Sequence, residues 1–450
     1  MLNSILIANR GEIAVRIIKT CKEMGIRTVQ VHSQADSDSM AVQMADEAIE
    51  IGPAPAAKSY LNGVKIIEAA LMAGVEGVHP GYGFLSESAD FAQMIEKAGL
   101  IFVGPRSETI RSLGDKVEAR KIAVDAGLKV VPGTPKGITE SAEAIASASM
   151  IGFPVMIKAA AGGGGRGIRI AGDEAVLREM LQISASEAQA AFGDGTLYLE
   201  KVIKNARHIE VQFIGDGKDY VHCFERECSL QRRRQKVWEE APAMCVSNKI
   251  RKQICEAALS LAKKVGYVGV GTVEFLYDEQ HKEFYFIEVN TRIQVEHPVT
   301  EMITGIDLVR VMIEIAGTGT LPLSQKDVNM SGHAIECRIN AEDPSNDFFP
   351  SPGLVEELLI PSGENVRFDS MLYEGYVVPP FYDSLIGKLV VLGESREGAL
   401  KKMRNALAEM QIRGIDTTIP LHRQLIDNKQ VQDGIFDTNF LELLLSENDK

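Results

Sequence analysis

The sequence predicts a multidomain protein that combines α/β and α+β architecture. From residue 1 to about 113, short apolar runs alternate with amphipathic segments, which is the pattern of parallel βαβ units. Beyond about residue 134, predicted strands often follow one another with only turns between them, as in antiparallel sheets. A length of 450 residues suggests roughly two to four domains with ample hydrophobic core.

The first 113 residues predict a Rossmann-like half. A buried strand is expected at 5–8, and Ile13, Ile17 and Cys21 then recur at helical spacing. Further strands that run into turns are expected at residues 28–32, 77–85 and 100–105. No GxGxxG follows the first strand, which disfavours a dinucleotide enzyme. Tyr82 stands between two glycines, where it either lines a cleft or caps the sheet edge, and the residues alone favour the sheet edge.

A helix and a small α+β unit are predicted next. Gly114-Asp-Lys116 opens the helix, which ends near Gly127, and the α+β unit spans about 134–203. A strand at 197–203 closes this unit. The cleft beside that strand would suit an adenine ring, recognised by backbone groups at Lys201 and Ile203.

Within this unit, a run of four glycines at 162–165 lies between strands expected at 153–158 and 168–171. Backbone amides without side chains can approach an anion closely. The run is not a Walker A motif, because no Gly-Lys-Ser/Thr follows it. We interpret it as a flap over phosphate groups, with Lys158 as a second positive anchor; a solvated surface hairpin is the alternative.

The middle of the chain carries an unusual basic run. Strands are expected at 208–213 and 219–225, and an amphipathic helix at 248–265. Between them, Arg232-Arg-Arg-Gln-Lys236 places four cations within five residues. A charge run is usually a solvated face, but this one lies between strands, which favours an anion site.

The most informative stretch is a predicted β-hairpin whose strands cover 271–277 and 284–289. Its polar turn centres on residue 281 and places Glu274 opposite Glu288. Like charges opposite each other destabilise a sheet, and a magnesium ion between them would reverse the sign. A metal site and a solvated hairpin are equally compatible with this stretch. From Glu288 on, every second residue is polar, and these side chains share one face if the chain stays extended: Glu288, Asn290, Arg292, Gln294 and Glu296.

The chain changes character again after about residue 330. A strand is expected at 332–344, with Glu336, Arg338 and Asn340 alternating along it. A rigid turn at 379–384 and a helix from 396 to about 410 follow.

Composition narrows the class of protein. The net charge of −14 argues against nucleic-acid binding and against a basic membrane-surface protein. We find no signal peptide and no apolar run long enough to span a membrane. Six cysteines without CxxC or zinc spacing fit structural thiols in a reducing compartment. A cytoplasmic enzyme is the expectation.

Several motifs together resemble the biotin carboxylase family of ATP-grasp enzymes. They are Ala8-Asn-Arg-Gly-Glu-Ile-Ala, His79-Pro-Gly-Tyr-Gly-Phe, the glycine run after Lys158, Glu288-x-Asn-Thr-Arg-Ile-Gln-Val-Glu-His-Pro, Arg338-Ile-Asn-Ala-Glu-Asp and Tyr382-Asp-Ser. The resemblance extends from residue 2 to the 440s. It implies an ATP-grasp fold in three domains: a Rossmann-like domain at 1–113, an ATP-grasp domain at 114–330 with a mobile flap at about 134–203, and a C-terminal biotin carboxylase domain at 331–446.

The resemblance also implies roles for individual residues. ATP would be bound by Lys116, Lys158, Gly163, Gly164, Gly165, Arg166, Gly167, Glu200, Lys201, Ile203, His208 and Gln231. Magnesium or manganese would be held by Glu274, Glu288 and Asn290, and bicarbonate by Lys236, Arg292, Gln294 and Val295. Glu296 would be the general base, and the other catalytic residues would be Lys236, Arg292 and Arg338. Arg338 would steady the ureido oxygen of biotin, and Tyr82 would lie near biotin.

The implied reaction is the ATP- and bicarbonate-dependent carboxylation of biotin through carboxyphosphate. No Ala/Val-Met-Lys-Met biotin-attachment motif is present, so biotin is expected on a separate biotin carboxyl carrier protein, with carboxyltransferase subunits completing a complex. Acetyl-CoA carboxylase, in fatty acid synthesis, is the expected complex, and propionyl-CoA, pyruvate and other acceptors are alternatives. The family resemblance also implies a homodimer.

Two departures and three alternatives accompany this resemblance. Arg234 occupies a position where many relatives have His, and a guanidinium can contact phosphate but cannot relay a proton. Ala161 stands where some relatives have another glycine.

Another ATP-grasp ligase would lack Arg338 and the 292–296 pattern. A non-catalytic nucleotide-binding regulator would have lost Glu288, Glu296 or Lys236, and a dinucleotide enzyme is disfavoured by the loops.

Overall fold

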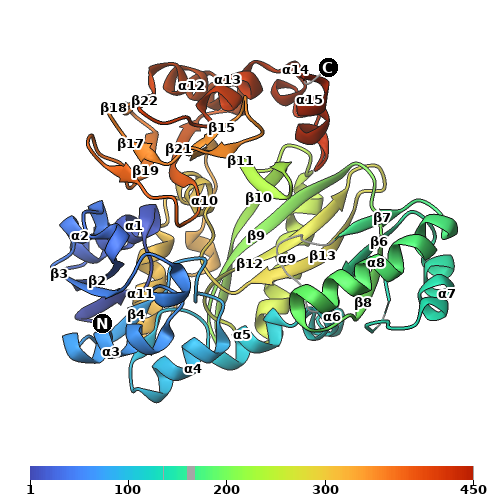
Figure 1. The fold of residues 1–450 in the computed structure, drawn as a ribbon, viewed down its shortest axis with the longest axis horizontal. Coiled ribbons are helices and arrows are strands. Elements are labelled where there is room, and N and C mark those ends of the chain that lie inside the picture. Colours follow the sequence, from blue (N-terminus) through green and yellow to red (C-terminus); the bar gives the residue numbers. More distant parts are fainter. Residues whose placement is uncertain (135, 160–167, 449–450) are drawn as a thin grey trace.

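The computed structural model describes residues 1–134, 136–159 and 168–448 and confirms the mixed α/β and α+β class (Figure 1). The glycine flap lies outside the described residues, and with it the predicted ATP-binding residues Gly163, Gly164, Gly165, Arg166 and Gly167. Among the residues that are described, no helix combines the length and the apolar character needed to cross a membrane.

The N-terminal region, blue in Figure 1, forms the predicted Rossmann-like half. Its five parallel strands lie in the order β3-β2-β1-β4-β5. They are β1 (Ser4–Ile7), β2 (Arg27–Ser33), β3 (Glu47–Gly52), β4 (Gly77–His79) and β5 (Ile101–Phe102). The helices are α1 (Gly11–Glu23), α2 (Met40–Met44), α3 (Gly63–Ala73), α4 (Ala89–Lys97) and α5 (Ser107–Gly114). Ile13, Ile17 and Cys21 of α1 are buried, as their helical spacing predicts.

A small lobe follows, green at the right of Figure 1. The predicted helix α6 (Lys116–Asp125) leads into it, and Asp115 caps that helix by accepting from the backbone of Val117 and Glu118. The lobe is a three-stranded antiparallel sheet in the order β7-β6-β8, with two helices and a hydrophobic core of its own. Its elements are α7 (Ser141–Ile151), β6 (Val155–Ala159), β7 (Arg169–Ala171), α8 (Glu174–Phe192) and β8 (Leu197–Lys201).

The largest element is one antiparallel sheet of eight strands in the order β13-β12-β9-β10-β11-β14-β21-β19. The strands are β9 (Ala206–Asp216), β10 (Tyr220–Arg232), β11 (Gln235–Ala241), β12 (Val268–Asp278), β13 (Glu283–Asn290), β14 (His333–Asn340), β19 (Val366–Ser370) and β21 (Leu385–Gly393). Helices α9 (Asn248–Lys264), α10 (His297–Thr304), α11 (Leu308–Thr318) and α12 (Arg396–Glu409) pack against it. The sheet therefore joins the middle of the chain to its C-terminal part.

Short elements complete the C-terminal part, orange to red in Figure 1. The strands are β15 (Glu342–Asp343), β16 (Phe349–Pro350), β17 (Gly353–Leu354), β18 (Glu357–Leu359), β20 (Val377–Val378) and β22 (Gln411–Arg413). The last helices are α13 (Ile419–Asp427), α14 (Lys429–Gln432) and α15 (Phe440–Asn448).

The predicted hairpin is β12 and β13, and the predicted pairing of Glu274 with Glu288 is confirmed. A register shift between Glu274 and Phe275 produces this pairing, because the pairs nearer the turn, such as Phe275 with Phe286, are offset by one residue. The expectation that the chain stays extended beyond it is wrong. Strand β13 ends at Asn290, and α10 begins at His297. Pro298 lies in the first turn of α10, where its fixed φ and missing N–H suit a helix start. The polar side chains after Asn290 therefore reach the site from a turn, not from one face of a strand.

The outer end of β11 is tied to the C-terminal part by a buried ion pair. Glu240, which is 2% exposed, accepts two hydrogen bonds from the Arg396 guanidinium, at 2.6 and 2.8 Å, and one from the Trp238 indole at 2.9 Å. His333 lies 2.9 Å away. Although burial opposes ionisation, His333 and Arg396 lower the pKa of Glu240 to about 2. The carboxylate is thus ionised at neutral pH.

Replacing Arg396 with Met is expected to lower the free energy of unfolding by roughly 3–5 kcal/mol, because Glu240 would lose its guanidinium partner while remaining buried. Arg404→Met on the same helix is the matched control, since Arg404 and Asp427 are 44% and 69% exposed, and such a pair contributes about 1 kcal/mol or less. Trp238 is the only tryptophan, so its fluorescence during urea unfolding reports on β11. Equal losses in the two variants would contradict the prediction.

Candidate active site

A large cleft of about 1190 Å³ lies where the N-terminal half, the lobe, the eight-stranded sheet and the C-terminal part meet. Every predicted site residue that the structure describes lines it. These are Tyr82, Lys116, Lys158, Glu200, Lys201, Ile203, His208, Gln231, Lys236, Glu274, Glu288, Asn290, Arg292, Gln294, Val295, Glu296 and Arg338. The placement of Tyr82 at a sheet edge is therefore wrong, because the turn after β4 directs the ring into the cleft.

Three glutamates form a row across neighbouring strands, and two of them, Glu274 and Glu288, line the cleft. Glu288 on β13 pairs with Glu274 on β12, and Glu274 pairs in turn with Glu210 on β9. Arg226 on β10 is opposite Glu210 and ends the row. Glu210 and Arg226 were not predicted as site residues. Extending the hairpin register to a third strand would have found Glu210, but the strand order β12-β9 cannot be read from the sequence.

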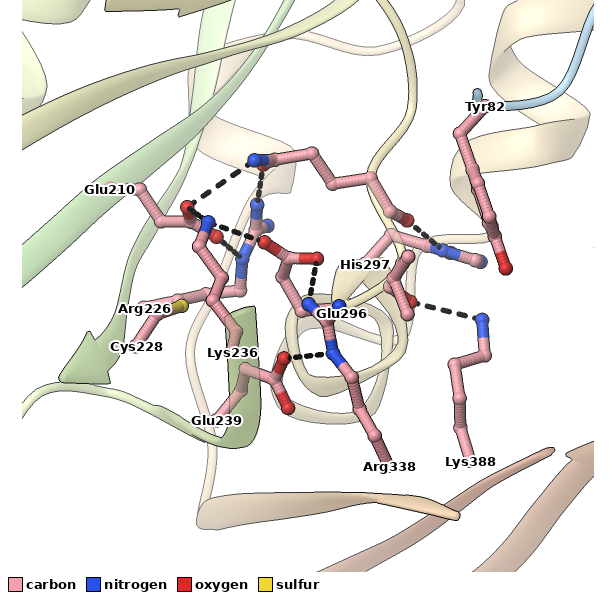
Figure 2. A network of polar contacts seen from close by, with 12 residues as sticks. Tyr82, Glu210, Arg226, Cys228, Lys236, Glu239, Glu296, His297, Arg338 and Lys388 are labelled. Atoms are coloured by element: carbon pink, nitrogen blue, oxygen red, sulfur yellow. Dashed lines mark hydrogen bonds and ion pairs between the residues drawn. The ribbon is translucent and has the colours of Figure 1, made fainter. Parts of the chain in front are cut away.

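Lys236 gathers carboxylates from three segments. Its Nζ donates to Glu210 and to Glu296, both at 2.6 Å (Figure 2). It also donates to Glu274 at 2.9 Å. Burial opposes the ammonium charge, but the three carboxylates prevail and raise the pKa of Lys236 well above its usual value. In the same way, Lys236 and Arg226 overcome burial and lower the pKa of Glu210 to about 2.

Arg226 lies beneath this cluster and is fully buried. It donates to Glu210 at 2.8 Å and to Gln294 Oε1 at 2.7 Å. The amide nitrogen of Gln294 donates in turn to Glu274 at 2.8 Å. Arg226 thus fixes the direction of the Gln294 amide, which faces the cleft.

Arg338 reaches the same cluster from β14. Its Nε donates to Glu239 at 2.6 Å and its Nη2 to Glu296 at 2.9 Å (Figure 2). Burial again opposes ionisation of Glu296, but Lys236 and Arg338 lower its pKa from the usual value. Glu296 is therefore an ionised carboxylate between two cations.

The lobe contributes a second group of charges. Lys158 on β6 pairs with Glu200 on β8, and Arg120 lies 3.4 Å from the same carboxylate. Across the cleft, His208 Nε2 lies 3.0 Å from Glu274, while Gln231 lies 3.1 Å from the other ring nitrogen of His208. This part of the cleft thus places two cations, a carboxylate and a histidine around one space.

Two further contacts tie the N-terminal half to the cleft. Glu87 accepts from Arg292 Nε at 3.0 Å, and Arg292 Nη2 donates to Asn290 at 2.9 Å. The Tyr82 hydroxyl donates to the buried carboxylate of Glu12. Residues just before α4 and at the start of α1 therefore position Arg292 and Tyr82.

The basic run divides between two environments. The hairpin turn between β10 and β11 gives Arg233 and Arg234 positive φ angles of 47° and 66°. Arg232 and Arg233 share Asp347, at 2.8 and 3.0 Å, while Arg232, Arg234 and Lys236 line the cleft. The interpretation of the run as one anion site is wrong for Arg233, which is 66% exposed and lies outside the cleft lining.

The acidic row fits a hard divalent cation. The Glu288 side chain is exposed within the cleft, but the cleft walls still withdraw it from bulk water. This desolvation, together with the facing Glu274 carboxylate, raises the pKa of Glu288. Asn290 adds an amide beside Glu274, to which it donates at 2.8 Å. Carboxylate and amide oxygens are the ligands that magnesium prefers. His208, Glu210 and Glu274 also place ligand atoms within 4.8 Å of one another.

Comparison with known families accounts for almost the whole chain. Residues 1–110 match the biotin carboxylase N-terminal domain, and residues 336–443 match the biotin carboxylase C-terminal domain. Residues 115–324 match the ATP-binding domain of the carbamoyl-phosphate synthase L chain.

Curated relatives are similar over their full length. The chain is 50% identical to biotin carboxylase 1 of Bacillus subtilis over 443 residues, which is 98% of each chain. It is 51% identical to biotin carboxylase of Pseudomonas aeruginosa over 98% of each chain. It is 46% identical to a pyruvate carboxylase subunit of Methanothermobacter thermautotrophicus, covering 98% of this chain and 90% of that one.

Solved structures share the fold. A biotin carboxylase complex with β,γ-ATP from Campylobacter jejuni has a TM-score of 0.95 and 47% identity, covering 98% of this chain and 99% of that one. The biotin carboxylase domain dimer of the Hydrogenobacter thermophilus 2-oxoglutarate carboxylase, solved with MgADP, ADP and bicarbonate, has a TM-score of 0.94 and 45% identity over 98% of each chain. The chain therefore belongs to the biotin carboxylase family.

Proposed function

We propose that this protein carboxylates biotin, with ATP and bicarbonate as co-substrates. The observation that carries the proposal is the convergence of Lys236, Arg338 and Glu296 beside the acidic row. A phosphoryl donor at the acidic row and an anion at the two cations would lie within one cleft. The full-length similarity to biotin carboxylases supports the same activity.

The residues can divide the reaction between them. Lys116, Lys158, Glu200, Lys201, Ile203, His208 and Gln231 are proposed to bind ATP, together with the glycine flap. Glu274, Glu288 and Asn290 are proposed to hold magnesium or manganese, which would neutralise phosphate charge during transfer. Lys236, Arg292, Gln294 and Val295 are proposed to bind bicarbonate.

Glu296 is the proposed general base. It is ionised beside two cations, so it can accept the bicarbonate proton at the same place where bicarbonate is held. The deprotonated bicarbonate oxygen then attacks the γ-phosphoryl group of ATP, which forms carboxyphosphate and ADP. Carboxyphosphate breaks down to carbon dioxide and phosphate, phosphate can take the N1 proton of biotin, and the deprotonated N1 then attacks carbon dioxide to form carboxybiotin. Arg338 would stabilise the negative charge on the ureido oxygen, with Tyr82 beside biotin.

We further propose that residues 1–113, 114–330 and 331–446 act as three domains, with 134–203 as a lobe that closes over ATP. The family matches have similar limits, and the lobe has its own sheet and core. The continuous eight-stranded sheet indicates that the second and third of these domains move together.

The partners proposed are a biotin carboxyl carrier protein, carboxyltransferase subunits and a second copy of this chain. These 450 residues contain no biotin-attachment motif, and the Hydrogenobacter relative is described as a dimer. Acetyl-CoA is the proposed final acceptor. Pyruvate is the second candidate, because the chain is 46% identical to one component of a pyruvate carboxylase. Capture of this protein by separately purified biotinylated carrier proteins would distinguish the two complexes.

The activity itself is tested with free biotin and labelled bicarbonate. ADP formation is expected to require magnesium and to be stimulated by bicarbonate, and biotin is expected to gain the label only when ATP is present. ADP formation that is indifferent to bicarbonate, or biotin that stays unlabelled, would refute the proposal.

Replacing Glu296 with Ala or Gln is expected to lower the carboxylation rate by roughly 10²–10⁴-fold, the usual contribution of a general base. The KM for ATP should change little, because Glu296 contacts Lys236 and Arg338, not the lobe. Steady-state kinetics with ATP varied at saturating bicarbonate gives both quantities. An unchanged rate would remove Glu296 from this role.

Replacing Glu288 with Gln is expected to raise the magnesium concentration needed for half-maximal activity by about tenfold or more, since one of two facing carboxylates is lost. Glu283→Gln is the matched control, because Glu283 lies on the same strand but pairs with Lys129 outside the cleft. A magnesium titration of ADP formation measures both variants. The same dependence in Glu288→Gln and wild type would exclude Glu288 as a ligand.

A further inference from the structure

Two buried carboxyl groups lie side by side next to Arg338. Glu239 on β11 and Glu336 on β14 are directly opposite each other in the antiparallel ladder. Side chains in such positions share a face, with their Cβ atoms about 5 Å apart. Both residues are fully buried. Two ionised carboxylates in this arrangement would repel each other without water to screen them.

Hydrogen bonding leaves this pair incomplete. Glu239 Oε1 accepts from Arg338 at 2.6 Å. The other oxygen of Glu239 and both oxygens of Glu336 have no hydrogen-bond partner among the described residues. Buried acceptors without a donor are costly. A protonated carboxyl carries an O–H donor, so one proton on the pair supplies the missing hydrogen bond.

The groups around Glu336 on its own face do not neutralise a charge there. Val390 is its partner on β21, and Lys388 is the nearest cation on that strand. Lys388 is already engaged, because it donates to the Val295 carbonyl at 2.9 Å and pairs with Glu12 at 3.0 Å. The β21 side of Glu336 is therefore apolar or committed elsewhere.

The other charged groups on the face of the sheet that carries Glu336 also leave it without a counter-ion. Arg338 is shared between Glu239 and Glu296, so two carboxylates already face one guanidinium. Helix α10 contributes His297, whose pKa burial and Lys388 lower well below its usual value, which leaves it neutral. On β19, Arg367 is the partner of Val390, but it is already paired with Glu301 of α10 at 2.7 Å and with Asp369 at 2.6 Å. A second anion at Glu336 would therefore have no cation of its own.

The opposite face of β11 and β14 is separate. There, Glu240 binds Arg396 of α12, and Cys337 is a buried thiol.

Burial, followed by the Glu239 carboxylate, raises the pKa of Glu336 well above its usual value. Burial also raises the pKa of Glu239, to about 7, against the opposing influence of Arg338. Arg338 donates a hydrogen bond to Glu239 and stabilises the ionised form of that carboxylate. Glu336 has no such partner and lies against apolar groups, so the proton shared by the pair resides on Glu336.

We propose that Glu336 is a positioning residue that stays protonated at neutral pH and donates its O–H to Glu239 Oε2. This inference rests on the proposed biotin carboxylation. The hydrogen bond holds the Glu239 carboxylate in one orientation, with its other oxygen directed at Arg338 Nε. Arg338 is in turn held beside Glu296, at the end of the cleft proposed for biotin. Glu336 thereby orients Arg338 without touching substrate.

Activity as a function of pH tests the proposal. Glu336→Gln supplies an N–H donor that cannot be lost, so near neutral pH its kcat/KM for biotin should stay within about threefold of wild type. As pH rises and Glu336 ionises, wild type should lose activity while the variant keeps it, so the ratio of variant to wild type should increase. Glu336→Leu, which has no donor, should lose about 10- to 100-fold. A ratio that stays constant with pH, or an unaffected Leu variant, would overturn the proposal.

Infrared difference spectroscopy on the full-length protein tests the protonation state without any activity. Wild type minus Glu336→Gln at neutral pH should contain the carbonyl band of a carboxylic acid. Glu240→Gln is the matched control: this neighbouring buried glutamate is bound to Arg396 and ionised, so its replacement should remove carboxylate bands instead. Carboxylate bands in the Glu336 difference spectrum would overturn the inference. An inactive wild type that still shows the acid band would refute only the carboxylation proposal.

Discussion

The contact on which the site depends most is that of the Lys236 ammonium with three buried carboxylates. Removing these charges from water costs several kcal/mol per ion, and only close mutual contacts offset that cost. The contacts come from β9, β12 and the turn before α10, so one side chain of β11 fixes three separate segments. Arg226 completes the arrangement beneath it. These residues therefore form an ionic network beneath the cleft, in which removing any one charged side chain leaves an oppositely charged group buried without that partner.

Local features of this architecture could be predicted from the sequence. The polar turn at 278–283 predicted the hairpin and brought Glu274 close to Glu288, although a register shift next to Glu274 completes their pairing. The Asp115 cap and the spacing of apolar residues in α1 gave helix starts and faces. In each case the information lies within a few residues of the chain, and backbone geometry alone converts it into structure. The resemblance of the motifs to one family supplied the remaining site residues.

Features that depend on strand order could not be predicted. Glu210, Arg226 and Glu239 enter the site because β9, β10 and β11 lie between β12 and β14 in the sheet. A single sequence contains no signal for that order. The prediction of an extended chain at 291–296 failed for a related reason. Ile293 is fully buried, and α10 packs on four strands, so tertiary packing and Pro298 bend the chain where alternation favours a strand. The ion pairs of Arg232 and Arg233 with Asp347 are likewise non-local.

The eight-stranded sheet has a consequence for how distances in the cleft are maintained. On a flat sheet, β12 and β11 would be separated by three strand spacings, or roughly 14 Å, yet Lys236 on β11 contacts Glu274 on β12 at 2.9 Å. The sheet is therefore strongly twisted, not flat, and the long side chains of Lys236 and Glu274 close the remaining gap. The sheet therefore fixes the distance between the acidic row and Arg338 on β14. The backbone of the strands and the hydrogen bonds between them thus set the distance between the acidic row and Arg338. Closure of the proposed lobe above the cleft leaves this distance unchanged.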